Sequence, residues 1–319
     1  MLALKDKWVW DFWFAVDNDE VHIFFLQAPR SLGDPERRHH HASIGHAVSR
    51  DYRTWTTLPD ALHPGADGEW DDLATWTGSV IRDGTVWRML YTGVCRDEGG
   101  CIQRIGLATS RDLLQWDKHP ENPVLQADPR WYEMLTPGRW KDQSWRDPYL
   151  YRIDGQDGIY ALITARSPLG PADGAGVIAQ ARSVDGVNWE VLPPLTAPGE
   201  FAQVEVPQPV RVGDRRMVLF SCLAGDHSKE RRQRLGTPGA SGTFAFVYDE
   251  QRQDYEATEL PILSREGETL YAAKLVRGPG GEDALIAFRA DGPDGFVGEL
   301  TDPLPVMLDG RGKVGAVRG

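Results

Sequence analysis

A seven-residue pattern that recurs three times constrains this chain more than any other feature of its sequence. The pattern is SxDxxxW, and it occurs as "SRDYRTW" at residues 49–55, "SRDLLQW" at 110–116 and "SVDGVNW" at 183–189. Each copy follows an alternating apolar run, namely "SIGHAV", "RIGLAT" and "VIAQAR". Such alternation predicts a strand, and serine and aspartate side chains bond local backbone in turns. Each copy therefore predicts a strand, a turn and a second strand, which the tryptophan opens as a core anchor between neighbouring sheets.

The spacing of the three copies predicts the architecture. They start 61 and 73 residues apart, which is the length of one four-stranded propeller blade with its loops. About five such units fit into 319 residues, and other short alternating runs with turn residues lie between the copies. No long amphipathic period of 3.6 residues stands out. The sequence therefore predicts an all-β protein, a five-bladed β-propeller that forms a single domain over residues 1–319.

Charge and hydropathy argue against two classes of partner. Lysine and arginine number 35 against 47 aspartates and glutamates, so the formal net charge is −12, and such a surface repels the phosphate backbones of nucleic acids. No stretch of 18 apolar residues occurs, so no membrane span is predicted. The first residues, "MLALKDKWVWDFWF", lack the pattern of a secretory signal, and a cytoplasmic location is the expectation. The sequence gives no indication of the oligomeric state.

Cysteine and histidine patterns do not predict a metal or cofactor site. Cys95, Cys101 and Cys222 are odd in number and have no CxxC spacing, which favours reduced, structural thiols. The run "RRHHHAS" holds three consecutive histidines, His39–His41, but neighbouring side chains on a strand point to opposite faces. We expect these histidines to be rim or packing residues, and neither a cofactor nor a catalytic metal is expected.

Three acids lie at positions that a propeller would bring together at its central channel. The innermost strands of all blades line one channel, so residues near their starts converge although they are far apart in sequence. Asp11 in "WVWDFWF", Asp147 in "WRDPYLY" and Glu205 in "VEVPQPV" lie near the starts of predicted inner strands, among aromatic or apolar residues where an unpaired carboxylate is costly. Taken singly, each has a structural alternative: a backbone cap, an Asp-Pro turn and an edge-strand residue, respectively.

Taken together, the three acids predict cleavage of a glycosidic bond. In that chemistry one carboxylate attacks the anomeric carbon or activates water, and a second, protonated one donates to the leaving oxygen. A third acid can hold sugar hydroxyls. Carboxylates that share a dry site raise one another's pKa, which would supply the protonated acid. Neighbouring aromatic side chains, Trp10 among them, would offer flat faces to a sugar ring.

The same residues resemble those of glycoside hydrolase clan J, families 32 and 68, which include invertases, levanases and levansucrases. The segments that carry the resemblance fall in family order along most of the chain: "VWDFW", "IGHAVSRDYRTWTTLPDALHP", "WTGSVIRDG", "MLYTG", "IGLATSRDLLQW", "WRDPYLYR" and "EVPQPV". "VWDFW" is closer to the levansucrase version of this motif than to the asparagine-containing version of invertases. The resemblance implies a retaining β-fructofuranosidase with a propeller fold.

Carried over residue by residue, the resemblance implies a role for each motif position. Asp11 would be the nucleophile that forms a fructosyl-enzyme ester, Glu205 the acid/base, and Asp147 the residue that binds furanose hydroxyls. Arg146 would keep Asp147 ionised and contact the sugar. The remaining positions would bind substrate: Gln27 beside the nucleophile, Trp76 and Thr77 at the sugar-binding wall, and Tyr271, with Lys274, at the rim of the fifth blade.

Two departures from family 32 accompany the match. Val206 replaces the cysteine that usually follows the acid/base glutamate, so the residue beside that acid differs from the family pattern. The length also leaves no room for the C-terminal β-sandwich of family 32 after five blades, so a propeller alone is expected, as in family 68.

Several functions remain open on the sequence alone. The first is hydrolysis of sucrose or another small fructosylated saccharide, including a phosphorylated one. Fructosyl transfer, as in levansucrase, and cleavage of another furanoside such as an arabinofuranoside are the enzymatic alternatives. A sugar-binding propeller without turnover is the non-enzymatic one, and the intact acid trio argues against it.

Overall fold

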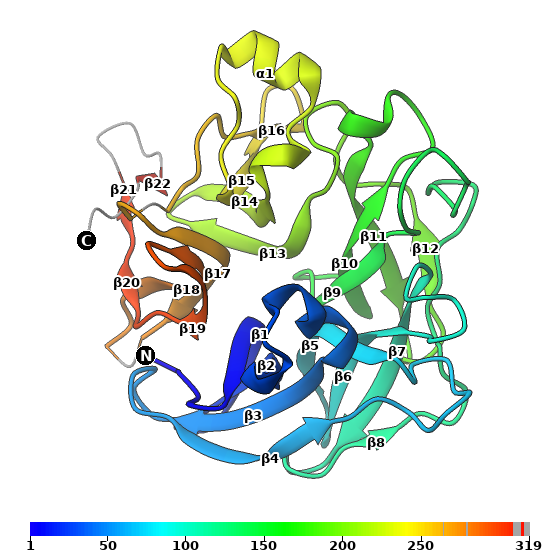
Figure 1. Ribbon diagram of the computed structural model, residues 1–319, viewed down its shortest axis with the longest axis vertical. Helices are drawn as coiled ribbons and strands as arrows, with labels where there is room; N and C mark the ends of the chain where they lie inside the picture. The colour runs from blue at the N-terminus through cyan, green and yellow to red at the C-terminus, as the bar shows by residue number, and fades with distance from the viewer. Residues whose placement is uncertain (264, 279, 309–313, 316–319) are drawn as a thin grey trace.

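The fold is a five-bladed β-propeller, as the sequence predicts (Figure 1). The computed structural model describes residues 1–263, 265–278, 280–308 and 314–315. In this part of the chain, five four-stranded antiparallel sheets surround a central channel, and each sheet follows chain order from its innermost strand outward, except that β20 pairs with β18 in the fifth. That residues 1–319 form one domain stays a prediction.

The strands of the five blades have the following bounds. The first blade contains β1 (Lys7–Asp17), β2 (Glu20–Pro29), β3 (Ser43–Ser49) and β4 (Thr56–Leu62), and the second contains β5 (Ala74–Asp83), β6 (Val86–Val94), β7 (Gln103–Ser110) and β8 (Asp117–Lys118). The third contains β9 (Trp145–Tyr151), β10 (Ile159–Arg166), β11 (Gly176–Ser183) and β12 (Glu190–Leu192), and the fourth contains β13 (Glu205–Val212), β14 (Arg215–Cys222), β15 (Gly242–Asp249) and β16 (Asp254–Ala257). The fifth contains β17 (Thr269–Arg277), β18 (Asp283–Gly292), β19 (Gly295–Leu300) and β20 (Leu304–Pro305), and a hairpin of β21 (Met307–Leu308) and β22 (Val314–Gly315) follows.

The helices are short and lie between blades or strands. They are η1 (Arg30–Leu32), η2 (Pro35–His41), η3 (Ala172–Gly174), η4 (Ala224–Asp226) and α1 (Lys229–Leu235). The side chain of Ser228 caps α1 by accepting a hydrogen bond from the backbone N–H of Arg231, and Gly236 ends it with a φ of 66°. The histidines His39–His41 belong to the helix η2 and not to a strand, which corrects the sequence-based argument about their directions.

The SxDxxxW copies form the turns between the third and fourth strands of three blades, as predicted. In the first copy, Asp51 accepts hydrogen bonds from the backbone N–H groups of Arg53 and Thr54, at 2.8 and 2.7 Å, and from Ser49 Oγ at 2.9 Å. The aspartates of the other two copies accept the same set of bonds. The three tryptophans are partly buried and pack against the apolar clusters of the core. The repeat therefore fixes a turn by side-chain hydrogen bonds and anchors the outer strand by its indole.

The ring closes between the first and fifth blades. The backbone N–H of Leu300 donates to the carbonyl of Leu2 at 3.0 Å, and the guanidinium of Arg30 donates to the carbonyl of Val297 at 3.1 Å. The N-terminal ammonium group forms an ion pair with Asp302. The start of the chain thus lies beside the last blade, as Figure 1 shows.

Within the described residues, no helix has the length and apolar character needed to cross a membrane. Cys95, Cys101 and Cys222 are free thiols, as predicted.

Candidate active site

All five innermost strands interrupt their regular pairing as they line the channel. Each carries a β-bulge, a device that bends a strand and re-aims its side chains. The bulges lie at Asp11 in β1, Thr77 in β5, Asp147 and Pro148 in β9, Val206 and Pro207 in β13, and Ala272 and Ala273 in β17. Side chains of the predicted catalytic positions therefore project from a ring of kinked backbone.

Three bulge residues adopt the left-handed backbone conformation. The φ angles of Asp147, Val206 and Ala272 are 57°, 55° and 51°. Residues other than glycine rarely adopt this conformation, and β-branched residues such as valine adopt it least often. The freed N–H groups are bonded to the preceding blade: Asp147 N–H donates to Thr92 Oγ1 at 3.0 Å, and Ala272 N–H donates to Ser221 Oγ at 2.8 Å. Contacts between blades thus hold the backbone in its strained form.

The three predicted acids converge in this ring. Asp147 Oδ2 accepts hydrogen bonds from Thr164 Oγ1 at 2.8 Å and from the N–H of Val206, the residue after Glu205, at 3.1 Å. Asp11 Oδ2 accepts from Thr77 Oγ1 at 2.9 Å. The charges of Asp147 and Glu205 both act on the ionisation of Asp11. The acids therefore come from the first, third and fourth blades to one site, as the sequence predicts.

Arg146 forms the expected ion pair with Asp147, but its closer partner is Glu205, which the sequence did not predict. Its guanidinium donates to Glu205 Oε1 at 2.6 Å, whereas the nearest Asp147 oxygen lies 3.7 Å away. Two buried glutamines hold the guanidinium in place, because Gln103 Oε1 and Gln203 Oε1 each accept from it at 3.0 Å. The pairing crosses from the third blade to the fourth, and for that reason the adjacency of Arg146 and Asp147 in sequence does not reveal it.

The pKa values of the three acids are shifted in different directions. Burial, together with the charges of Asp147 and Glu205, raises the pKa of Asp11 to about 7. Burial alone would raise the pKa of Glu205, but the Arg146 guanidinium and the hydroxyl of Tyr271, 2.5 Å from Glu205 Oε2, lower it below its ordinary value. Burial also raises the pKa of Asp147, against the opposing charge of Arg146. Burial and like charges thus favour protonation within the trio, as expected, but the raised pKa values are those of Asp11 and Asp147 and not that of Glu205.

The predicted aromatic wall is built around a histidine. The indole Nε1 of Trp76 donates to the carbonyl of His39 at 2.7 Å, and the His39 ring meets Trp10 and Trp76 edge to face, with centroids 6.1 and 6.5 Å away. Trp10 is buried, and the guanidinium of Arg38 lies 5.5 Å from its ring centroid. Burial and the charge of Arg38 lower the pKa of His39 to about 3, so its ring is neutral.

Two other predicted substrate-binding residues are buried. Gln27 lies on β2, and its amide donates a hydrogen bond to Ser43 Oγ at 3.3 Å. Tyr271 is buried and binds Glu205, so it belongs to the site's interior and not to the rim.

Sequence reasoning missed two polar residues that support the acids, Gln103 and Gln203, and misplaced a third, Lys274. The two glutamines orient Arg146, as described above. Lys274 is 3% exposed, and its ammonium group donates to the carbonyl of Val206 at 2.8 Å, which corrects its expected place at the rim. A lysine inside the apolar run "TLYAAKLV" was the available signal, because lysine is almost never fully buried without a partner.

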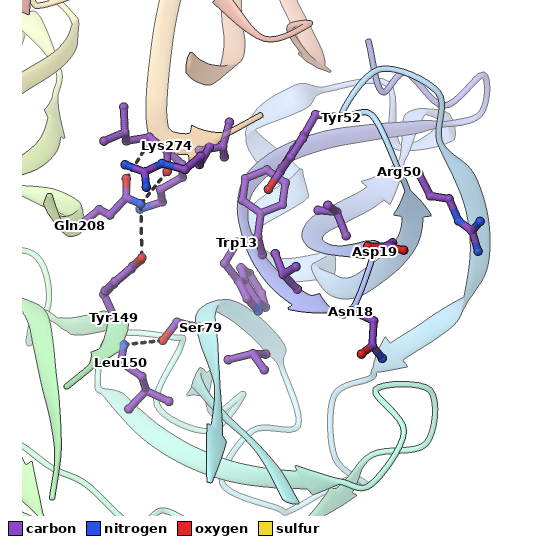
Figure 2. A pocket seen from close by; sticks show the side chains of 17 residues that line it. Trp13, Asn18, Asp19, Arg50, Tyr52, Ser79, Tyr149, Leu150, Gln208 and Lys274 are labelled. Atoms are coloured by element: carbon purple, nitrogen blue, oxygen red, sulfur yellow. Dashed lines mark hydrogen bonds between the residues drawn. The ribbon is translucent and has the colours of Figure 1, made fainter. Parts of the chain in front are cut away.

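A cavity of about 680 Å³ is lined by inner-strand residues beyond the bulges and by residues of the first blade (Figure 2). Its lining includes Trp13, Ser79, Tyr149, Gln208 and Lys274, and each of these residues follows the bulge of its own inner strand. The acids are not in its lining. We place the chemistry at the bulges, because carboxylates with shifted pKa values are there, whereas the volume of a cavity alone indicates no reaction.

Among the described residues, no group of three or more histidine, cysteine, aspartate or glutamate side chains could hold a metal ion. The expectation that the chain needs no metal or cofactor stays a prediction.

Comparison with known proteins settles the family. Residues 13–292 match the family model for the N-terminal domain of glycosyl hydrolases family 32. The chain belongs to glycoside hydrolase family 32. The predicted resemblance to clan J is thereby confirmed, and the matched region contains the bulges of four of the five inner strands.

Relatives of this family 32 chain include both hydrolases and transferases. A sucrose:sucrose 1-fructosyltransferase of Festuca arundinacea is 34% identical over 182 residues, which cover 54% of this chain and 24% of that enzyme. An extracellular sucrase of Zymomonas mobilis is 26% identical over 288 residues, covering 76% and 66% of the two chains. The family 32 chain thus spans about a quarter of the first relative and about two thirds of the second.

Solved structures of similar fold include a family 32 enzyme and an inulosucrase. The family 32 β-fructofuranosidase BmSUC1 of Bombyx mori superposes with a TM-score of 0.71 at 23% identity, covering 97% of this chain and 62% of that one. The inulosucrase of Halalkalicoccus jeotgali bound to kestose superposes with a TM-score of 0.77 at 21% identity, covering 97% and 88%. At these identities the structures confirm the propeller fold of the family 32 chain.

Proposed function

We propose that this family 32 chain is a retaining β-fructofuranosidase that cleaves sucrose or a small fructosylated saccharide. The observation that carries the proposal is the convergence of Asp11, Asp147 and Glu205 from three blades, with Thr77, Arg146 and Tyr271 bonded to them. The names of the relatives, sucrase and fructosyltransferase, support a fructoside as substrate.

In the proposed double displacement, Asp11 is the nucleophile and Glu205 acts first as an acid and then as a base. Asp11 attacks the anomeric carbon of the fructosyl unit while Glu205 donates its proton to the leaving oxygen, so that an ester to Asp11 forms and the glycosidic bond breaks. Water then attacks the same carbon, gives its proton to Glu205 and releases Asp11 as a carboxylate. Asp147 accepts hydrogen bonds from Thr164 and from the N–H of Val206 on Oδ2, which leaves Oδ1 to accept from furanose hydroxyls.

The mechanism requires one proton on the pair of Asp11 and Glu205, and it requires that proton on Glu205. In the unliganded site the pairing of Glu205 with Arg146 and Tyr271 favours the other arrangement, with the proton on Asp11. The pair therefore titrates as a unit, and the productive form is the minor one of two singly protonated forms. Activity should fall at high pH where the pair loses this proton, near the pKa of Asp11, about 7.

Fructosyl transfer to a sugar acceptor is the second candidate, and the fescue relative favours it. It uses the same trio and differs in what attacks the ester. An arabinofuranoside or other furanoside as substrate stays an alternative within the enzymes. The cytoplasmic location and the lack of nucleic-acid partners stay predictions.

The test is to incubate the purified chain with sucrose and short fructo-oligosaccharides and to measure free glucose and free fructose separately. Equal release of both sugars from sucrose would support hydrolysis, and glucose in excess of fructose would support transfer. Asp11→Ala and Glu205→Gln should abolish release. Asp17→Ala is the matched control, because Asp17 ends the same strand β1 and pairs with Arg82 outside the site. No release from any fructoside would refute the substrate while leaving the fold in place.

A further inference from the structure

The side chain of Lys274 is a buried cation in the mostly apolar inner strand β17. It lies on β17, is 3% exposed, and pairs across the strand with Ile286 of β18. An ammonium group is costly to bury unless hydrogen bonds and opposite charges compensate it. The contacts of the Lys274 ammonium group therefore indicate its role.

The first contact of Lys274 is with the strained backbone beside the predicted acid/base. Its Nζ donates to the carbonyl of Val206 at 2.8 Å, and the N–H of Val206 donates to Asp147 Oδ2 at 3.1 Å. Val206 follows Glu205 directly and has a φ of 55°. The backbone of Val206 is thus held in an unfavourable conformation by two charged groups, Lys274 at its carbonyl and Asp147 at its N–H. These bonds also position the backbone of the neighbouring Glu205.

The second interaction is electrostatic. Asp11 from β1 and Asp147 from β9 are the charged groups whose fields act on Lys274, and the Tyr149 ring of β9 lies 5.5 Å from its Nζ. Burial lowers the pKa of Lys274 to about 8, against the pull of the two carboxylates, so the group is a cation at neutral pH. The same charge acts in return to lower the pKa of Asp11.

Lys274 also divides the channel. It belongs to the lining of the cavity in Figure 2, beside Gln208 and Tyr149, and it reaches from there to the carbonyl of Val206. The acids lie on the side of the bulges. Lys274 therefore lies between the acid site and the cavity.

We propose that Lys274 is a positioning residue of the acid trio, which acts from the floor of the channel by holding the Val206 peptide and by supplying the positive charge that favours ionised Asp11. This inference rests on the proposed function, in which Asp11 must be ionised to attack. Arg146 supplies the other cation of the site but is committed to Glu205. Without Lys274 the shared proton would move further onto Asp11 and away from Glu205.

The test uses three substitutions at Lys274 and one control. Lys274→Gln removes the charge and keeps a donor for the Val206 carbonyl, Lys274→Met removes both, and Lys274→Arg keeps both. Arg277→Met is the control, because Arg277 ends the same strand and lines the same cavity but is exposed and pairs with Asp283. The readouts are the pH profile of kcat/KM on sucrose, the split between kcat and KM, and a ¹³C NMR titration of the Asp11 carboxyl, which Asp11→Asn assigns.

Lys274→Gln should raise the midpoint of the Asp11 titration by about one pH unit, the lower end of what a neighbouring opposite charge does to a carboxyl. It should lower kcat about tenfold with little change in KM, because the productive protonation form becomes about tenfold rarer. Lys274→Met should lose more, Lys274→Arg should restore the midpoint, and Arg277→Met should behave as wild type. A midpoint and a kcat that stay at the wild-type values in Lys274→Gln would overturn the proposal.

Two measurements separate this inference from its premises. If the substituted chains do not fold, the ¹³C titration of the unmodified protein should still show a second inflection near pH 8, where Lys274 loses its proton. Its absence would overturn the proposal. If the wild-type protein releases no sugar from any fructoside, the proposed function fails, whereas the NMR titration still decides whether Lys274 controls the ionisation of Asp11.

Discussion

The hydrogen bond from Thr77 to Asp11 should control the pH dependence of the enzyme. Thr77 is buried, and its hydroxyl donates to Asp11 Oδ2 at 2.9 Å, which stabilises the ionised carboxylate. Thr77→Val keeps the shape of the side chain and removes this donor. A hydrogen bond to a charged group contributes about 1.5 to 3 kcal/mol, and one pKa unit corresponds to about 1.4 kcal/mol. The pKa of Asp11, about 7, should therefore rise by about one to two units in the variant.

The expected result follows from the shared proton. The basic limb of kcat/KM, where the pair of Asp11 and Glu205 loses its last proton, should move from about pH 7 to about pH 8 or 9. The plateau should fall about tenfold to hundredfold, because the proton then resides even less often on Glu205. The assay is the pH profile of sucrose hydrolysis under kcat/KM conditions.

The matched control for this experiment lies two residues earlier on the same strand. Thr75 is fully buried, and within the described part of the chain its hydroxyl has no hydrogen-bond partner. Thr75→Val is thus the same substitution without the loss of a bond, and it should leave the pH profile unchanged. A basic limb that stays in place in Thr77→Val, or that moves equally in both variants, would refute the reasoning.

Three further predictions concern stability. The pKa of Asp11 lies near 7 in the fold and at 3.8 when unperturbed, so its burial costs stability that is small at pH 4, grows as the pH rises and is complete above pH 7. Asp11→Asn should therefore stabilise the protein at pH 8 by up to about 4 kcal/mol, with little gain at pH 4; denaturant titrations at both pH values check this. Arg231 is fully buried and paired with Glu200, and Arg231→Met should lower the free energy of unfolding by about 3 to 5 kcal/mol. Arg234 is half-exposed and paired with the same glutamate, and Arg234→Met should lower it by less than about 1 kcal/mol. Equal losses in chemical unfolding would contradict the burial argument. Gly78→Ala should destabilise by about 1 to 3 kcal/mol, because the new Cβ would lie 2.3 Å from the carbonyl oxygen of Leu90, and a thermal midpoint equal to that of the wild type would show that β5 can move aside.

The repeat made the architecture predictable because it encodes local structure. The serine and aspartate of SxDxxxW bond amides within five residues, so the turn is legible without any knowledge of the rest of the chain. The fourth blade shows the limit of this signal. Asp249 accepts hydrogen bonds from the N–H groups of Gln251 and Arg252 in the same way, but neither the serine nor the tryptophan accompanies it. The blade had to be inferred from length.

The acids were predictable for a different reason, since each is an isolated charge in an apolar strand. Their partners were not, because they come from other blades. The bond between Arg146 and Glu205 joins residues 59 positions apart, and the bond between Lys274 and Val206 joins residues 68 apart. The bulges decide both pairings, and a bulge breaks the very alternation from which strand faces are read. Lys274 could be recognised as unusual from sequence but not placed beneath the trio.

Strained backbone and buried carboxylates coincide at one level of the channel. Positive φ angles at Asp147, Val206 and Ala272 coincide with the buried carboxylates, and each left-handed N–H is bonded to a side chain of the preceding blade. Such conformations cost of order 1 to 3 kcal/mol each and persist only where the surrounding structure over-determines them. The five-bladed ring provides that support, because a bulge in one inner strand can relax only if the neighbouring blade gives up its hydrogen bond. It follows that substitution of Asp11, whose burial raises its pKa to about 7, should stabilise the fold while abolishing the chemistry, whereas substitutions of the supporting hydroxyls of Thr92 and Ser221 should weaken both.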